Sequence, residues 1–387
     1  MIGSALLWLS VVSVTLLGLL TSSPLNACTF CAGGYANRQT FRERAKDATI
    51  IVHGKLADPQ FGPDGKGTTD LVVTTQLKSD DKLVTPAKVK IPQYLPVVGD
   101  TPRDYLLYAG VVEGKIDIVS GVSVPPESVS YVKEAMGLPA GDATKRLAFY
   151  FRHLDSKDPT ISGDAFLEFA KASDREIAQA AAAFDVAKIR QWLADPKTPA
   201  ERLGVYAVLL GLCGKSGDEQ AIQALLTTSP RPERVSSNLG GLLAGLTLIN
   251  SKAGWKQIGD LVTNANAPLD ERLFALGTIR FFEQTREKET KSEILAIYKS
   301  LLAQGDLADM AVEDLRRWGW WNLTAEVLKP FDAKTPPAPI LRQAIVRYAL
   351  TCQDEASQAF LQRVRKSDPA LVERVEEGLK RFANPKP

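Results

Sequence analysis

The pattern of hydrophobic and polar positions divides the chain into two parts with different periodicity. From about residue 49 to residue 124, short runs rich in β-branched residues alternate with Gly, Pro and Asp. The clearest runs are 49–54 and 69–78, and residues 64–67 between them have the composition of a hairpin tip. Such runs between turn residues are typical of antiparallel strands in a small sheet or barrel. From Ser128 onward, aliphatic residues recur every three or four positions, which predicts helices.

Turn residues divide the helical part into a series of helix pairs. We expect the pairs 199–213 with 218–228, 236–249 with 253–264, 268–284 with 289–303, 306–318 with 322–331, and 339–352 with 354–365. A period in the thirties of residues is the signature of a stacked helical-repeat array. On this spacing, residues 145–381 resemble the HEAT-like α-solenoids. The resemblance implies that each pair buries its apolar face against its neighbours, with the charged helix 369–382 as a polar cap.

The N-terminal apolar segment bears on where the protein is located. Residues 6–20 are apolar except for scattered Ser, Thr and Gly, and this core is shorter than the roughly 18 to 20 residues of a spanning helix. It predicts a secretory signal peptide at 1–27 with Ala27 at the cleavage point, and an uncleaved membrane anchor is the alternative. We therefore expect an exported protein of the periplasm or cell envelope, with no transmembrane span after signal cleavage.

The length of 387 residues fits two or three domains. The predicted fold is α+β and multidomain. A small antiparallel β-barrel-like domain is expected at 28–125, followed by a predominantly α-helical, HEAT-like solenoid domain at 126–387.

Charge and histidine content narrow the function classes. The chain has 47 basic and 45 acidic residues, so its formal charge is only +2. This balance argues against nucleic acid as the main partner, because phosphate contacts need a basic surface. His53 and His153 are the two histidines and lie in different predicted elements, which excludes a His-rich metal site. We expect no cofactor and no enzymatic activity.

Two of the four cysteines, Cys28 and Cys31, follow the apolar segment directly. Residues 25–28 resemble the lipobox of bacterial lipoproteins, which implies a lipid anchor on Cys28. In an oxidising compartment the alternative is a local disulfide between Cys28 and Cys31, and a thiol-disulfide redox site is a further one. Ala32 stands where a haem-attachment motif needs His. Cys213 and Cys352 end apolar helices and are expected to be buried free thiols.

The densest aromatic cluster is a candidate binding surface. Its members are Arg316, Arg317, Trp318, Trp320 and Trp321. Indole and guanidinium groups are over-represented among interface hot spots. The alternative is that the indoles fill the space between helix pairs, with Gly319 allowing the chain to turn.

Residues 28–124 are similar to the netrin-like and metalloprotease-inhibitor-like barrels of the OB type. The shared features are Cys28, Phe41 and the strand 50–55. This resemblance implies protease inhibition through a free N-terminal Cys28. The family usually has one residue between its first two cysteines, whereas two stand between Cys28 and Cys31, and its partner cysteines in the barrel are absent here.

Several segments together resemble a group of exported bacterial proteins of unknown function. These segments are 28–31, 38–41, 164–170, 195–199 and 314–318. This resemblance spans the chain and implies no activity. The predicted function is therefore a non-catalytic binding or scaffold protein whose helical-repeat surface contacts another envelope protein. A redox protein acting through Cys28 and Cys31, or an inhibitor-like N-terminal module, remains the alternative.

Overall fold

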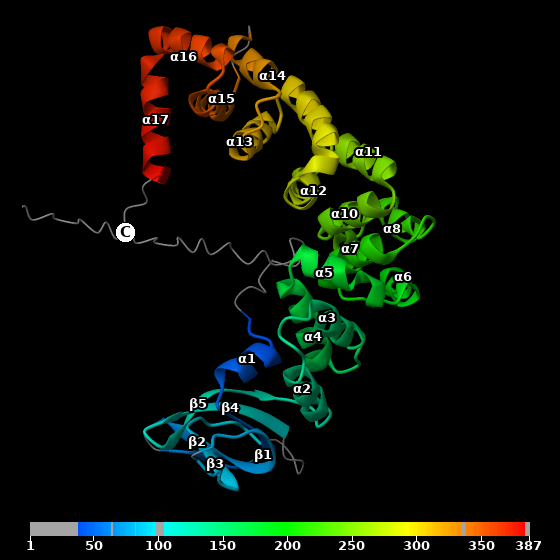
Figure 1. Cartoon of the computed structure of the whole chain (residues 1–387), viewed down its shortest axis with the longest axis vertical. Helices are drawn as coiled ribbons and strands as arrows, with labels where there is room; N and C mark the ends of the chain where they lie inside the picture. The colour runs from blue at the N-terminus through cyan, green and yellow to red at the C-terminus, as the bar shows by residue number, and fades with distance from the viewer. Residues whose placement is uncertain (1–37, 63–64, 82, 98–103, 334–336, 384–387) are drawn as a thin grey trace, which may run out of the picture.

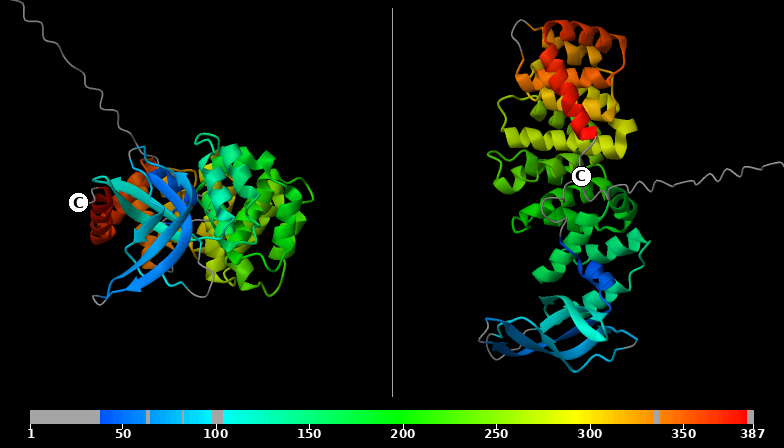
Figure 2. Two further views of the ribbon diagram at one scale, coloured as in Figure 1. Left: turned by 90° about the horizontal axis from the view of Figure 1, so that it is seen from below. Right: turned by 90° about the vertical axis from the view of Figure 1, so that its left-hand side faces the viewer.

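The computed structural model describes residues 38–62, 65–81, 83–97, 104–333 and 337–383 of the chain. The predicted signal peptide at 1–27 and the pair Cys28 and Cys31 lie outside these residues. A five-stranded sheet near the N-terminus is followed by helices up to the end of the described chain (Figure 1). The fold is thus α+β, as predicted. Figure 2 shows the sheet at one end of the molecule, with the helices stacked away from it.

The strands form an open sheet. They are β1 (Ile50–Phe61), β2 (Gly67–Lys78), β3 (Lys88–Ile91), β4 (Asp104–Val112) and β5 (Lys115–Ser123). All pairs are antiparallel, in the order β3-β2-β1-β4-β5. The expected barrel is therefore wrong for the described residues. The physical reason is that β3 is only four residues long and pairs with β2 alone, so the two edge strands share no hydrogen-bond ladder.

The two faces of the sheet enter different cores, because successive side chains of a strand point to opposite faces. Ile51, Leu106 and Tyr108 pack into the main core shared with the helices. Val52 and Leu107, which alternate with them, belong to a second core on the other face. The sheet is therefore attached to the helical part through one face only.

The first helices cover that face. They are α1 (Phe41–Asp47), α2 (Ser128–Met136), α3 (Ala143–Phe151) and α4 (Pro159–Lys171). Thr40 starts α1 with a capping box in which Glu43 closes back on the Thr40 backbone. Asp158 caps α4 by accepting from the N–H groups of Thr160 and Ile161. Both helix starts are thus fixed by local sequence.

The remaining helices follow an arc from α4 to α17 (Figure 1). They are α5 (Asp174–Ala180), α6 (Val186–Ala194), α7 (Leu203–Cys213), α8 (Glu219–Leu226), α9 (Glu233–Ser236), α10 (Leu239–Ile249), α11 (Ser251–Val262), α12 (Leu269–Gln304), α13 (Ala308–Trp318), α14 (Thr324–Leu328), α15 (Pro339–Thr351), α16 (Glu355–Ser367) and α17 (Pro369–Ala383). Three short 3₁₀ turns lie at Ala181–Ala183, Ala200–Arg202 and Lys329–Asp332. Helices α7, α10, α12, α13, α15 and α17 contact one another in turn.

The helix boundaries agree with the predicted pairs, including the longest helix. Helix α12 has 36 residues and is interrupted at Arg286, whose φ of −146° and ψ of 37° are not helical. The interruption falls between the predicted helices 268–284 and 289–303. No helix in the described ranges is both long and apolar enough to cross a membrane.

Ion pairs join neighbouring helices in the middle of the series. Arg272 pairs with Asp306, Arg280 with Asp314, and Glu313 with Arg347, and the two members of each pair are 34 residues apart. The first two pairs join α12 to α13 and to the turn before it, and the third joins α13 to α15 with the charges reversed. Other ion pairs of the helical part span other separations, such as 28 residues for Arg190 with Asp218 and 40 for Arg231 with Glu271.

Helices α7 and α10 approach each other through small residues. A Cβ atom on Gly241 would lie 2.4 Å from the Cα of Gly204, and one on Gly245 would lie 2.2 Å from the carbonyl oxygen of Ala207. Glycine is required at both positions of α10 because backbone atoms occupy the space of a side chain.

Candidate functional site

The sheet and the helices meet at a buried polar cluster, which we call the junction. Asp164 of α4 accepts the backbone N–H of Phe41 on Oδ1 and the hydroxyl of Tyr131 on Oδ2, both at 2.7 Å. The Asp164 residue is only 7% exposed. One carboxyl thus ties α1 and α2 to α4.

Glu168, one turn further along α4, holds the same elements by charge. Arg42 Nε and Nη2 donate to its two carboxylate oxygens at 3.3 and 3.0 Å. Arg146 of α3 lies 3.9 Å from the same carboxylate and donates to Glu176 at 2.6 Å. A buried carboxylate between two guanidinium groups is compensated, and a two-point Arg contact fixes its geometry.

The junction shifts the protonation of Asp164. Burial raises the pKa of the Asp164 carboxyl to about 6, against the lowering effect of the bonds from Phe41 and Tyr131. The negative charge of Glu168 adds to the rise, and the Arg44 guanidinium opposes it. Burial also raises the pKa of the Tyr131 hydroxyl far above its usual range, so this group donates at all ordinary pH values.

A hollow of about 790 Å³ opens beside this cluster, and we call it the junction cavity. Its walls come from α1 and the residues before it, from β5, from the first turns of α4, and from the segment that leads into α7. The lining residues are Arg38, Gln39, Phe41, Arg44, Val122, Pro159, Thr160, Gly163, Asp164, Phe166, Leu167, Pro199, Glu201 and Arg202. Segments more than a hundred positions apart in the sequence therefore form one concave surface.

Two arginines of the cavity differ in how they are held. Arg202 donates to the carbonyl of Leu154 at 2.7 Å and to the Ser162 hydroxyl at 3.2 Å, and it lies over the ring of Phe166 at 5.6 Å. Arg44 has a buried Nε without a hydrogen-bond partner among the described residues. The Nε of Arg202 is likewise buried without a partner, although its two terminal nitrogens are bonded. The cavity thus combines a cation held by its terminal nitrogens with one for which no such bond is seen.

The predicted aromatic cluster is mainly a packing element. Trp320 is only 4% exposed, with its ring centroid 4.9 Å from Trp318 and the Lys291 ammonium 4.4 Å from its own ring. Trp318 stacks on Tyr298 at 5.7 Å, and Trp321 meets Tyr348 edge-on at 5.0 Å. Trp320 is therefore corrected as a candidate binding-surface residue: it is buried and packs between helices, as the alternative interpretation expected.

The chain turns at this cluster as the alternative interpretation expected. Gly319 ends α13 with a φ of 68°, a left-handed conformation that favours glycine. Arg316 is half-buried and donates to Glu313 at 2.9 Å. Of the five candidate surface residues, Arg317 alone is exposed. Arg317 therefore remains the member that can meet a partner.

The two histidines lie in separate packed settings. His53 Nε2 is 3.1 Å from Asp104 Oδ1, and its Nδ1 is 2.9 Å from Thr74 Oγ1. The His153 ring packs edge-on to Tyr131 at 4.9 Å, and burial lowers its pKa. No group of three or more His, Cys, Asp or Glu side chains in the described part of the chain could hold a metal ion.

Both described cysteines are free thiols, as expected. Cys213 donates to the carbonyl of Leu209, and burial raises its pKa to about 11. Cys352 is buried. The environment of Cys213 therefore disfavours the thiolate, which is the reactive form of cysteine.

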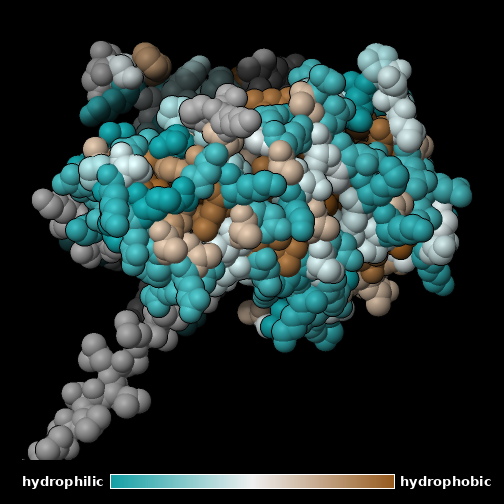
Figure 3. All heavy atoms as spheres, turned by 90° about the horizontal axis from the view of Figure 1, so that it is seen from above, coloured by the Kyte–Doolittle hydropathy of each residue, from teal (hydrophilic) through white to brown (hydrophobic). Residues whose placement is uncertain are grey.

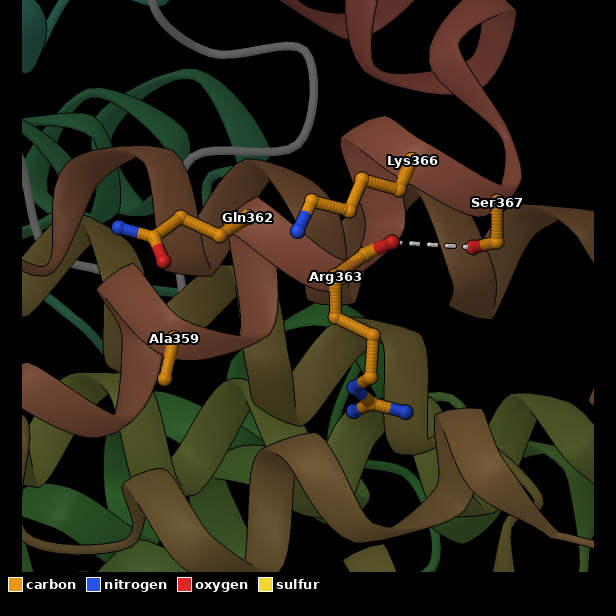
Figure 4. A pocket seen from close by; sticks show the side chains of 5 residues that line it. All are labelled: Ala359, Gln362, Arg363, Lys366 and Ser367. Carbon is orange, nitrogen blue, oxygen red and sulfur yellow. Dashed lines mark hydrogen bonds between the residues drawn. The ribbon is translucent and has the colours of Figure 1, made fainter.

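A second hollow lies on the surface of α16 (Figure 4). Ala359, Gln362, Arg363, Lys366 and Ser367 line it, all from this one helix. Arg363 already donates to both carboxylate oxygens of Asp332, at 2.5 and 2.8 Å. Figure 3 shows the molecule from this end as mainly hydrophilic, with apolar residues visible between polar side chains. The hollow lacks the converging walls of the junction cavity.

Sequence reasoning did not single out the junction as a site. Its signal is the placement of Asp164 and Glu168 four positions apart in an otherwise apolar stretch of α4. Two carboxyls on one buried helix face need partners from elsewhere in the chain. Three of the segments named above, 38–41, 164–170 and 195–199, contribute residues to the junction cavity. Comparison with known protein families, curated proteins and solved structures finds no match for this chain.

Proposed function

We propose that this protein is an exported, non-catalytic binding or scaffold protein of the cell envelope. In this proposal the helices from α7 to α17 form a HEAT-like α-solenoid, and its inner row contacts another protein. The observation that carries the proposal is the stacking of successive helices into an open arc (Figure 1). Arrays of this kind present extended concave surfaces to their partners.

Two further features support a protein partner. The inner helices α13 and α15 have few exposed positions, and Arg317 is the one charged residue among them. The ion pairs at a separation of 34 residues hold neighbouring helices in a fixed relation. A surface held in this way is preorganised, which lowers the entropic cost of binding.

Site-directed photo-crosslinking in the exporting cell tests this function. A photoreactive residue replaces Arg317 on α13 in the full chain, and a matched variant carries it at Gln362, which is exposed on α16. We expect a discrete crosslinked product from position 317 that is absent from position 362. Identical products from both positions, or none from position 317, would contradict the proposal.

The same samples test export. We expect the protein in the envelope fraction as a chain that begins at Cys28, and intact mass then distinguishes a lipid on Cys28 from a disulfide to Cys31. A full-length chain in the cytoplasmic fraction would contradict the export part of the proposal alone.

A further inference from the structure

The junction cavity has the construction of a small-molecule site. Its volume of about 790 Å³ lies within the range of roughly 300 to 1,000 Å³ typical of ligand pockets. Its walls belong to α1, β5, α4 and the start of α7, and the bonds of Asp164 and Glu168 lock α1 onto α4. The shape is therefore set by buried contacts and exists before any ligand arrives.

The charge of the cavity favours an anion. Three guanidinium groups, Arg38, Arg44 and Arg202, line it against two carboxyls. One of these, Asp164, already accepts a hydrogen bond on each oxygen, from Phe41 and Tyr131. The Nε atoms of Arg44 and Arg202 are buried without a hydrogen-bond partner among the described residues, and an anionic ligand would accept a charge-assisted hydrogen bond from the half-buried Arg44 guanidinium.

The rest of the lining favours a ligand in which the anionic group is attached to an apolar group. Phe41, Val122, Phe166 and Leu167 contribute carbon surface, and Pro159 and Pro199 extend it. A bare inorganic ion would leave this surface exposed to water. An apolar group attached to a carboxylate would cover it and gain the usual free energy of apolar burial.

We propose that the junction cavity binds an organic carboxylate, with Arg44 as the charge partner of the carboxylate and the apolar wall beside Phe166 as the seat of its hydrocarbon part. This site lies where the sheet joins the helices. It does not depend on the protein–protein contact proposed for the inner row of helices.

The structure offers a variant that fills the cavity without disturbing its walls. Gly163 lines the cavity, and a Cβ atom there would meet nothing within 4 Å, so a Phe side chain at this position leaves α4 without a clash at its first carbon. Gly277 in α12 is the matched control, because a Cβ atom there also meets nothing within 4 Å. Gly163→Phe is expected to block the cavity, and Gly277→Phe to leave it open.

Titration calorimetry on the full mature chain tests the site with 4-phenylbutyrate as the probe. The neutral analogue 4-phenylbutanol tests the need for the negative charge, and inorganic phosphate tests the need for the apolar group. We expect saturable binding of 4-phenylbutyrate at one site, and at least about tenfold weaker binding of each comparison compound. Gly163→Phe should abolish the binding of 4-phenylbutyrate, and Gly277→Phe should retain it.

Charge variants at Arg44 complete the test. Arg44→Gln should weaken binding of 4-phenylbutyrate by about tenfold, and Arg44→Lys should recover part of the loss because it keeps the charge. Circular dichroism confirms that each variant is folded. The proposal is overturned if 4-phenylbutyrate shows no saturable binding at millimolar concentration, if Gly163→Phe binds it as the unchanged protein does, or if phosphate binds equally well.

Discussion

The junction and the helical array are held together in contrasting ways. At the junction, Asp164 and Glu168 bind residues 123 and 126 positions earlier in the chain, through groups that are almost fully buried. In the array, three ion pairs join residues 34 positions apart, and each helix of the inner row contacts the next. The junction is thus a single long-range lock, whereas the array is a series of local steps.

This difference determines how far the effect of a single substitution spreads through the structure. In a stacked array, stability is approximately a sum over units and their interfaces, so damage to one unit stays local. A lock made of buried charges depends on every partner, because removal of one leaves the others uncompensated. Single substitutions in the two regions should therefore differ in how far their effects spread.

The largest effect is expected in the array at Trp320. Trp320→Ala removes a buried indole and should lower the free energy of unfolding by about 4 kcal/mol. Hydrogen exchange should show lost protection in α12 to α15 and retained protection in α1 and α4. Arg317→Ala is the control, because an exposed side chain should change stability by less than about 0.5 kcal/mol. An equal loss of protection at the junction would remove the contrast.

At the junction, Glu168→Gln should cost about 3 kcal/mol, because it breaks a buried ion pair from one side. The loss should appear in α1, α3 and α4 together, since Arg42 and Arg146 both depend on this carboxylate. Glu176→Gln is the comparison, because the Glu176 side chain is 33% exposed and should cost about 1 kcal/mol. Urea denaturation of the three proteins measures both values, and equal costs would contradict the lock.

Asp164 makes the stability of the junction depend on pH. Its folded pKa of about 6 exceeds the ordinary value of 3.8, so the folded state binds this proton more tightly than the unfolded state. The stabilising contribution is therefore present below 3.8 and is lost as the pH rises through about 6. The loss should be about 3 kcal/mol over this interval.

Asp164→Asn isolates that contribution, because the amide does not titrate. The difference in unfolding free energy between the unchanged protein and Asp164→Asn, measured at several pH values, should fall through this window. A difference that does not change with pH would show that burial does not raise the pKa of the Asp164 carboxyl.

The smallest effect is expected where the array is packed most closely. Gly245→Ala pushes a methyl group against the Ala207 carbonyl oxygen and should cost about 1.5 kcal/mol. Gly277→Ala meets no neighbour and should stabilise α12 by about 0.5 kcal/mol. Thermal unfolding of the pair measures the difference, and two changes of the same sign would argue against backbone contact between α7 and α10.

The sequence was informative where structure is local. The predicted helix 306–318 and strand 69–78 correspond to α13 and β2, since periodicity and turn residues act over a few positions. The prediction of a closed barrel was wrong. Closure depends on whether the edge strands β3 and β5 pair with each other, and the periodicity within a strand carries no information on that.

The candidate site residues could also be predicted only where their contacts are local in the sequence. The conformation of Gly319 follows from its own place at a helix end. The partners of Asp164 cannot be predicted in this way, because Phe41 and Tyr131 lie 123 and 33 positions away and nothing in their local sequence marks the contact. Its residue type predicted that Trp320 binds a partner, whereas the structure shows that it packs against Trp318 inside the helical part.

Helix α13 offers acidic groups to both of its neighbours. Asp314 and the preceding Asp306 pair with arginines of α12, and Glu313 pairs with Arg347 of α15. Loss of α13 would bring Arg280 toward Arg347, and a duplicated α13 would face its own carboxylates. The order of these three helices is therefore fixed by charge, so this part of the chain resists gain or loss of a helix even though its helices stack one on the next.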